Sequence, residues 1–162
     1  MRARSETGPK ARIESASKDK LRLWLRLLRS TRAIEAELRE RLRCEFGTTM
    51  PRFDVLAALS RHEKGMTMTA LSRLLIVSNG NVTGIVDRLV VDGLVIRIPD
   101  ENDRRATFVR LTRKGEAQFH TMAAAHEKWI AGMLGNVAPA DIDGLTALLG
   151  RLSSKPSAGD HE

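Results

Sequence analysis

The sequence contains one cysteine, Cys44, and no long apolar run. A single cysteine excludes an intramolecular disulfide framework. No apolar stretch approaches the roughly 18 residues of a membrane-spanning helix. The N-terminal segment, MRARSETGPKARIESASKDK, has basic residues but lacks the apolar core of a secretory signal. We therefore expect a soluble protein of the bacterial cytoplasm.

Residue groups that carry out catalysis or bind metals are also missing. We find no Ser-His-Asp or Cys-His arrangement, no prominent pair of carboxylates and no glycine-rich phosphate loop after a strand. The histidines, His62, His120, His126 and His161, lack metal-ligand spacing. We therefore expect neither an enzyme nor a metal site, and no cofactor.

Positive charge, by contrast, is abundant. The 162 residues include 27 Lys and Arg against 20 Asp and Glu, which gives a net charge of +7, and 42% of the residues are hydrophobic. The chain can therefore bury a core. Its charge favours an anionic partner, such as nucleic acid, a membrane surface or a phosphorylated small molecule, although surface arginines that only aid solubility would give the same balance.

The hydrophobic pattern predicts several helices and one pair of strands. The expected elements are helices over about 18–43, 50–64, 68–75 and 79–92, strands over 95–98 and 106–111, and helices over about 113–134 and 139–152. Expected helix caps and stops are Gly47, Thr49, Gly65, Ser78, Gly93 and Thr112. The apolar arc of the first helix is too wide for a surface helix of a small monomer, so we expect it also to pack against a partner chain.

This order of elements predicts a mainly α fold with a small β wing, because a helix-turn-helix followed directly by a hairpin is a winged helix. We expect disordered tails over 1–17 and 153–162, a winged helix-turn-helix over 48–112, and helical dimerisation segments over 18–46 and 113–152.

The helix after Ser78 has an unusual outer face of small and polar residues: Asn79, Gly80, Asn81, Thr83, Gly84, Asp87 and Arg88. Glycine and asparagine form helices less well than the Glu, Lys and Gln of a typical solvated face. They suit a face that must approach another surface closely and offer hydrogen bonds. Asn, Arg and the Thr methyl group can contact base edges in the major groove of DNA. A poorly optimised surface helix is the alternative interpretation.

The loop between the strands concentrates charge: Asp100, Glu101, Asp103, Arg104 and Arg105. An arginine at a loop tip can enter the minor groove, and a carboxylate can hold a guanidinium in place. Arg97 and Arg110 on the strands could reach phosphates. A solvated turn whose charges pair with one another is equally compatible with the local pattern.

Together, these motifs resemble the signature region of the MarR family of transcriptional regulators. The resemblance extends over about residues 20–152 and rests on these elements: Leu71-Ser72, Ser78-Asn79-Gly80-Asn81-Val82-Thr83, Asp87-Arg88-Leu89, Gly93-Leu94-Val95, Asp103-Arg104-Arg105, and Leu111-Thr112 with Gly115. It implies a homodimer that binds a palindromic operator as a regulator of transcription, with repression by promoter occlusion as the family-level expectation.

The resemblance also implies roles for individual residues. Those expected in the major groove, on bases or phosphates, are Ser78, Asn79, Asn81, Thr83 and Arg88. In the wing, Arg105 would enter the minor groove with Asp103 bracing it, and we place Arg104 on the phosphates.

Members of the family typically sense aromatic carboxylates, phenols or oxidants. The arginine-rich first helix would suit an aromatic acid or its coenzyme A thioester, and the candidate ligand residues are Arg22, Trp24, Arg26, Arg29, Phe46 and Phe53. A solubilising face, or ion pairs with Glu35, Glu37 and Glu40, would explain the same arginines. Two other functions stay open: a redox-sensing repressor that uses Cys44, and a sequence-tolerant architectural DNA-binding protein.

Overall fold

The computed structural model describes residues 9–99 and 107–153, with side chains over 17–99 and 107–152. The elements are α1 (Pro9–Phe46), α2 (Met50–Ser60), β1 (Met66–Thr67), α3 (Met68–Leu75), α4 (Asn79–Val91), β2 (Val95–Pro99), β3 (Thr107–Leu111), α5 (Arg113–Met133) and α6 (Pro139–Ser153). The fold is mainly helical with a small antiparallel sheet, as the sequence predicts. The chain divides into two compact units, residues 1–126 and 127–162.

Helix α1 begins earlier than the sequence pattern predicts. It starts at Pro9, so the tail expected over residues 1–17 is helical from residue 9 onward. Proline is well tolerated in the first turn of a helix, where its missing N–H would have no partner. The helix ends at Phe46, and Gly47 after it makes the expected stop through its φ of 59° and the hydrogen bond from its N–H to the Arg43 carbonyl (3.1 Å).

Helix α2 is shorter than predicted. It ends at Ser60 with Arg61 as its C-cap, and the expected stop at Gly65 is wrong. Gly65 instead forms a turn by donating to the His62 carbonyl at 2.7 Å, with φ of 87°. A Cβ there would lie 2.6 Å from the Val109 carbonyl oxygen. Glycine is therefore required by a close approach to β3.

The sheet has three strands in the order β1-β3-β2, and both pairings are antiparallel. Strands β2 and β3 pair from Val95 with Leu111 to Pro99 with Thr107. Strand β1 was not predicted, because two residues carry no alternating pattern. It joins Met66 to Val109 and thereby connects the segment before α3 to the wing.

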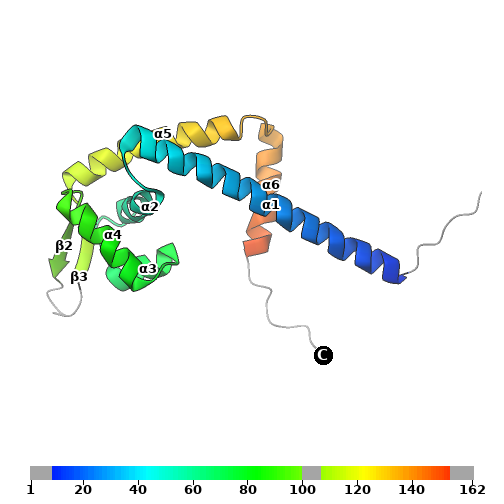
Figure 1. Ribbon diagram of the computed structural model, residues 1–162, viewed down its shortest axis with the longest axis horizontal. Coiled ribbons are helices and arrows are strands. Elements are labelled where there is room, and N and C mark those ends of the chain that lie inside the picture. Colours follow the sequence, from blue (N-terminus) through cyan, green and yellow to red (C-terminus); the bar gives the residue numbers. More distant parts are fainter. Residues whose placement is uncertain (1–8, 100–106, 154–162) are drawn as a thin grey trace, which may run out of the picture. The chain divides into compact units, whose positions relative to one another are not determined.

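The core of the first unit lies where α2, α3 and α4 meet the sheet. Figure 1 shows α3 and α4 beside α2, with α4 next to the paired strands. Side chains with at most 1% exposure come from each of these elements: Val55, Leu56, Leu59, Leu71, Val82, Val86, Leu89, Val95 and Val109. This core fixes the orientation of α4.

The junction between the wing and α5 is tightly packed. Thr112 caps α5, since its Oγ1 accepts from the Gly115 N–H at 2.9 Å and donates to the Gly93 carbonyl at 2.7 Å. A Cβ on Gly115 would lie 1.9 Å from the Leu94 carbonyl oxygen. Only glycine fits there.

The second unit presents an apolar row on α6. Its members are each between 46% and 66% exposed: Ile142, Leu145, Leu148, Leu149 and Leu152. They recur at helical spacing and so share one face.

Over the described residues, no single helix has the length and hydropathy of a membrane span; α3 and α4 reach them only as a pair, bent by 111°.

Candidate nucleic-acid interface

Helix α4 is fixed at its start by the predicted cap. The Ser78 Oγ accepts from the Asn81 N–H at 3.3 Å. The Thr83 hydroxyl donates to the Asn79 carbonyl at 2.8 Å, so this hydroxyl is already satisfied within the helix. The side chains expected to contact DNA from this helix, Ser78, Asn79, Asn81, Thr83 and Arg88, are all exposed.

The two glycines on the outer face of α4 are not required by the fold. A Cβ added to Gly80 or Gly84 would meet no heavy atom within 4 Å. Each glycine costs roughly 1 kcal/mol of helix stability relative to alanine. The fold therefore does not explain these glycines, and their small size suits a helix face that another surface approaches closely.

A groove of about 510 Å³ runs beside this face. The start of α2 forms one wall through Thr49, Pro51 and Arg52, and α4 forms the other, including Asn81 and Arg88. Arg52 forms an ion pair with Asp92, and its buried Nε has no hydrogen-bond partner among the described residues. No local sequence pattern points to Arg52, because its ion pair joins positions 40 residues apart.

The base of the wing is tied to the same helix. Arg97 Nη1 on β2 lies 2.8 Å from Asp87 Oδ1 on α4. Both side chains stay partly exposed, so this pair contributes little stability by itself. Arg97, expected on phosphates, is thus held at the edge of α4. Arg110 is exposed on β3. The wing-tip residues Asp103, Arg104 and Arg105 lie outside the described residues.

The candidate ligand residues do not converge within one chain. Arg22, Trp24, Arg26 and Arg29 are exposed along the first and middle parts of α1. Phe46 is at the end of α1, roughly 26 to 36 Å further along the helix at 1.5 Å per residue.

Phe53, another candidate ligand residue, belongs to the core. It is 7% exposed and stacks on His126 with the ring centroids 4.9 Å apart. Burial raises the pKa of the adjacent Asp54, and the proximity of His126 opposes that shift.

Ion pairs occupy the arginines in the last three turns of α1. Arg39 pairs with Glu35, Arg41 Nε lies 2.7 Å from Glu37, and Arg43 Nη2 lies 2.6 Å from Glu40. Arg26 and Arg29 have no ion-pair partner among the described residues. The positive charge of the arginines is thus neutralised toward the end of α1 and, within the described part of the chain, has no acidic partner near its middle.

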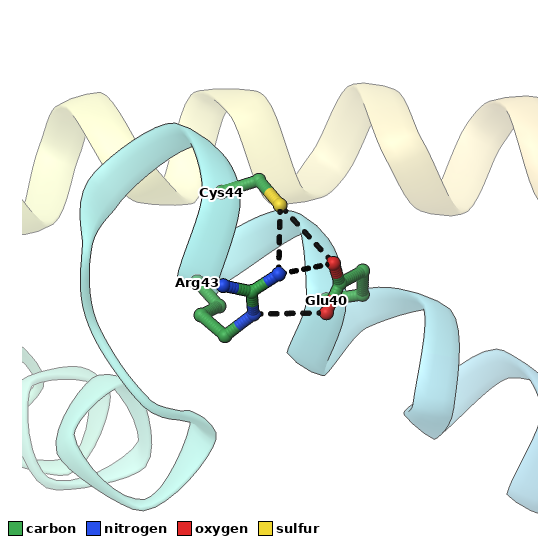
Figure 2. A network of polar contacts seen from close by, with 3 residues as sticks. All are labelled: Glu40, Arg43 and Cys44. Carbon is green, nitrogen blue, oxygen red and sulfur yellow. Dashed lines mark hydrogen bonds and ion pairs between the residues drawn. The ribbon is translucent and has the colours of Figure 1, made fainter.

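Cys44 lies beside one of these pairs (Figure 2). Its Sγ is 3.2 Å from Glu40 Oε1 and 3.5 Å from Arg43 Nη2. The hydrogen bond from the thiol to Glu40 raises the pKa of Cys44, while Arg43 holds the pKa of Glu40 down at about 2. Because the thiolate is the reactive form of cysteine, this surrounding favours a passive thiol over a redox sensor.

The turn before α4 contains a residue with an unusual backbone conformation that the sequence does not signal. Ile76 has φ of 54° and is 91% exposed. The Leu75-Ile76-Val77 sequence carries no glycine or asparagine to signal a left-handed residue.

No cluster of His, Cys, Asp and Glu that could hold a metal ion occurs in the part of the chain that the structure describes.

The fold and the exposed α4 define a winged helix-turn-helix protein. Residues 46–106 match a sequence model of the MarR family. A MarR family transcriptional regulator from Silicibacter pomeroyi is 32% identical, and the match covers 85% of this chain and 94% of that one with a TM-score of 0.71. The chain therefore belongs to the MarR family of transcriptional regulators, which act without catalysis.

Two further relatives inform the function. The transcriptional activatory protein BadR of Rhodopseudomonas palustris is 40% identical over 95 residues, which cover 57% of this chain and about half (49%) of BadR. A cysteine-to-serine variant of E. coli MarR, complexed with operator DNA, is 26% identical with a TM-score of 0.71, covering 84% of this chain and 96% of that one.

Proposed function

We propose that the protein binds double-stranded DNA in a sequence-specific manner and regulates transcription by a homodimer bound to a palindromic operator. The observation that carries the proposal is the exposed face of α4, where two glycines without a structural need lie among amides, a hydroxyl and an arginine. Such a face can enter the major groove closely. The operator complex of E. coli MarR supports the same use of this fold.

The structure supports distinct roles along α4. Asn79 and Asn81 offer amides that can pair with adenine edges, and the exposed Arg88 can bind guanine or phosphate. Because the Thr83 hydroxyl bonds to Asn79, its methyl group is the part available to a thymine. Ser78 sets the start of the helix through its cap.

In the wing, we assign Arg105 to the minor groove, Asp103 to its positioning and Arg104 to the phosphates. The pair of Arg97 with Asp87 supports this assignment, because it ties the wing base to the recognition helix. The phosphate contacts of the wing and the base contacts of α4 would then come from elements that are joined to each other.

A homodimer is supported by the apolar row of α6. Exposed leucines such as Leu145 and Leu148 gain stability when another apolar surface buries them, and the same row on a second copy can do so across a two-fold interface. The segments 18–46 and 113–152 would form this interface. A dimer would hold two recognition helices about one DNA turn, roughly 34 Å, apart. A regulator of chromosomal DNA works in the cytoplasm of a bacterium.

Repression by occlusion of the promoter is the first mode of action, since a dimer on an operator blocks polymerase wherever the two sites overlap. Activation is the second candidate, and the similarity to the activatory protein BadR favours it. The position of the operator relative to the promoter decides between the two modes, and a footprint upstream of the protein's own gene locates it.

A small aromatic acid, or its coenzyme A thioester, is the proposed effector that releases the DNA. Exposed Trp24 next to Arg26 and Arg29, which have no ion-pair partner among the described residues, supports a ligand with an aromatic and an anionic end. Titration of the operator complex with free acids and with their thioesters tests it. Release by neither class would contradict this assignment.

The test of DNA binding is selection from a random duplex pool, followed by mobility shifts. We expect a palindromic sequence whose affinity falls steeply with salt. Asn81→Ala should reduce the preference for this sequence over random DNA, and Arg105→Ala should lower affinity while the fold is kept. Equal affinity for selected and random DNA would instead indicate a sequence-tolerant architectural protein.

A further inference from the structure

Ile76 combines two features that are unfavourable in an isolated chain. Its backbone is left-handed, with φ of 54° and ψ of 43°, and its side chain is 91% exposed. It is the sole non-glycine residue with a positive φ in the described part of the chain. A β-branched residue in this conformation is strained, typically by about 1–2 kcal/mol.

The turn itself does not need the isoleucine side chain. Two backbone hydrogen bonds fix the turn, from the Ile76 N–H to the Arg73 carbonyl at 3.3 Å and from the Val77 N–H to the Ser72 carbonyl at 3.1 Å. Glycine would make the same bonds without strain. The side chain therefore gains no burial to offset the strain, and a strained residue without a structural benefit points to contact with another molecule.

The surroundings of Ile76 favour DNA as that molecule. Ile76 precedes the cap residue Ser78 by two positions, so it lies within about 7 Å of the start of α4. Its neighbour Val77 lines the same groove as Asn81 and Arg88. Leu74 (53% exposed) and Val77 (39% exposed) extend the apolar surface around it.

Charge points the same way. Residues 70–86 include Arg73 and no acidic residue, so the surface around Ile76 is compatible with a nearby phosphate backbone. The apolar row that a second copy would cover is on α6, and it does not include this turn. In the major groove, the apolar group on base edges is the C5-methyl group of thymine.

We infer that Ile76 contacts a thymine methyl group of the operator and selects thymine at that position. The inference rests on the proposed function, because it requires α4 to enter the major groove. It adds a specificity-determining residue outside the recognition helix itself.

The experiment uses the duplex that the full-length protein selects from a random pool, with thymine or deoxyuridine at each thymine position. Deoxyuridine removes only the methyl group. We expect the wild type to lose about fourfold in affinity at one position per half-site, the equivalent of one buried methyl group. Ile76→Gly and Ile76→Asn lack this contact in both half-sites, so they should bind the thymine duplex about 16-fold more weakly, fourfold per half-site, and be insensitive to deoxyuridine.

Stability separates this role from a structural one. Glycine and asparagine both tolerate the left-handed region. Ile76→Gly should therefore raise the Tm by about 2–4 °C while it weakens binding. Ile76→Leu keeps an apolar side chain and should keep the thymine preference. Val91→Ala is the matched control, because Val91 is 86% exposed at the far end of α4.

An equal penalty for deoxyuridine in the wild type and Ile76→Gly would overturn the inference, and so would unchanged affinity in both Ile76→Gly and Ile76→Asn. Either result leaves the proposed function intact as long as the pool yields a specific duplex. Failure to select any duplex would overturn the proposed function, and this inference with it.

Discussion

At the scale of single residues, the glycines of α4 separate stability from binding. Gly84 lies inside a helix with open space where a Cβ would stand. Gly84→Ala should raise the free energy of unfolding by about 1 kcal/mol, because alanine is the better helix former. The same methyl group would stand between α4 and the major groove. We expect weaker operator binding from a more stable protein, measured by urea denaturation and mobility shift. Full operator affinity would show that DNA does not approach this position closely.

Cys44 allows a second prediction at this scale, about pH. The carboxylate of Glu40 accepts a hydrogen bond from the thiol and raises the pKa of Cys44, so the thiolate forms only at a pH above its ordinary range. Glu40→Gln removes the negative charge and leaves Arg43 to favour the thiolate. The pH at which iodoacetamide alkylation is half-maximal should therefore fall in Glu40→Gln.

Cys44→Ser gives the baseline for alkylation. Peroxide treatment should not change the operator affinity of Cys44→Ser, which has no thiol. A passive thiol predicts the same result for the wild type. Loss of operator binding by the wild type alone after peroxide would restore the redox-sensing alternative.

At the scale of elements, Gly115 controls the junction of the wing with α5. The Cβ of Gly115→Ala would stand 1.9 Å from the Leu94 carbonyl oxygen, an overlap that backbone must relieve by moving. We expect destabilisation of about 3 kcal/mol, at the upper end of the usual range for overpacking. Gly132→Ala is the matched control on the same helix, because a Cβ there meets nothing within 4 Å. Equal unfolding curves for the two variants would contradict the packing seen at the junction.

Sequence predicted the elements whose signals are local. Ser78 was expected as a cap from its residue type, and it accepts the hydrogen bond that starts α4. The wing strands were expected from the alternation of apolar and polar residues. Thr67, which caps α3 in the same way, was not among the expected caps. The sequence did not predict β1, because this strand has only two residues and forms by pairing with the distant β3, where Met66 lies opposite Val109. The end of α2 was misplaced because Gly65 serves a contact with β3 rather than a helix end.

The site follows the same division. The outer face of α4 was predictable, since helical periodicity separates it from buried residues such as Val82 and Val86. The pairs of Arg52 with Asp92 and of Arg97 with Asp87 join separate elements, and no local pattern announces them. The strain at Ile76 is a property of backbone geometry, which residue type alone would have argued against.

At the scale of the whole molecule, the proposed function requires two copies of the chain. Leu145 is 48% exposed on α6, and a glutamate at this position would place a charge in the proposed interface at a cost of several kcal/mol. Leu145→Glu should sediment as a monomer, where the wild type sediments as a dimer, and keep its helical circular dichroism. Operator affinity should fall sharply, because the two half-sites are no longer bound together.

Ala147→Glu places the same charge about 160° away around the helix, at 100° per residue, and provides the control. It should remain dimeric. Monomers in both variants would point to general destabilisation of α6, and dimers in both would remove this face from the interface.

The strand order β1-β3-β2 has a consequence for how the wing can open. Because β3 is the inner strand, its backbone amides are held by neighbours on two sides, and Val109 is completely buried. Releasing the wing stem requires rupture of the ladder to β1, and that ladder includes Thr67, the cap of α3. In deuterium exchange, β3 should therefore be among the last segments of the sheet to take up label, in step with the hydrogen-bonded amides of α3. The stem of the wing and the helix-turn-helix then form one cooperative unfolding unit.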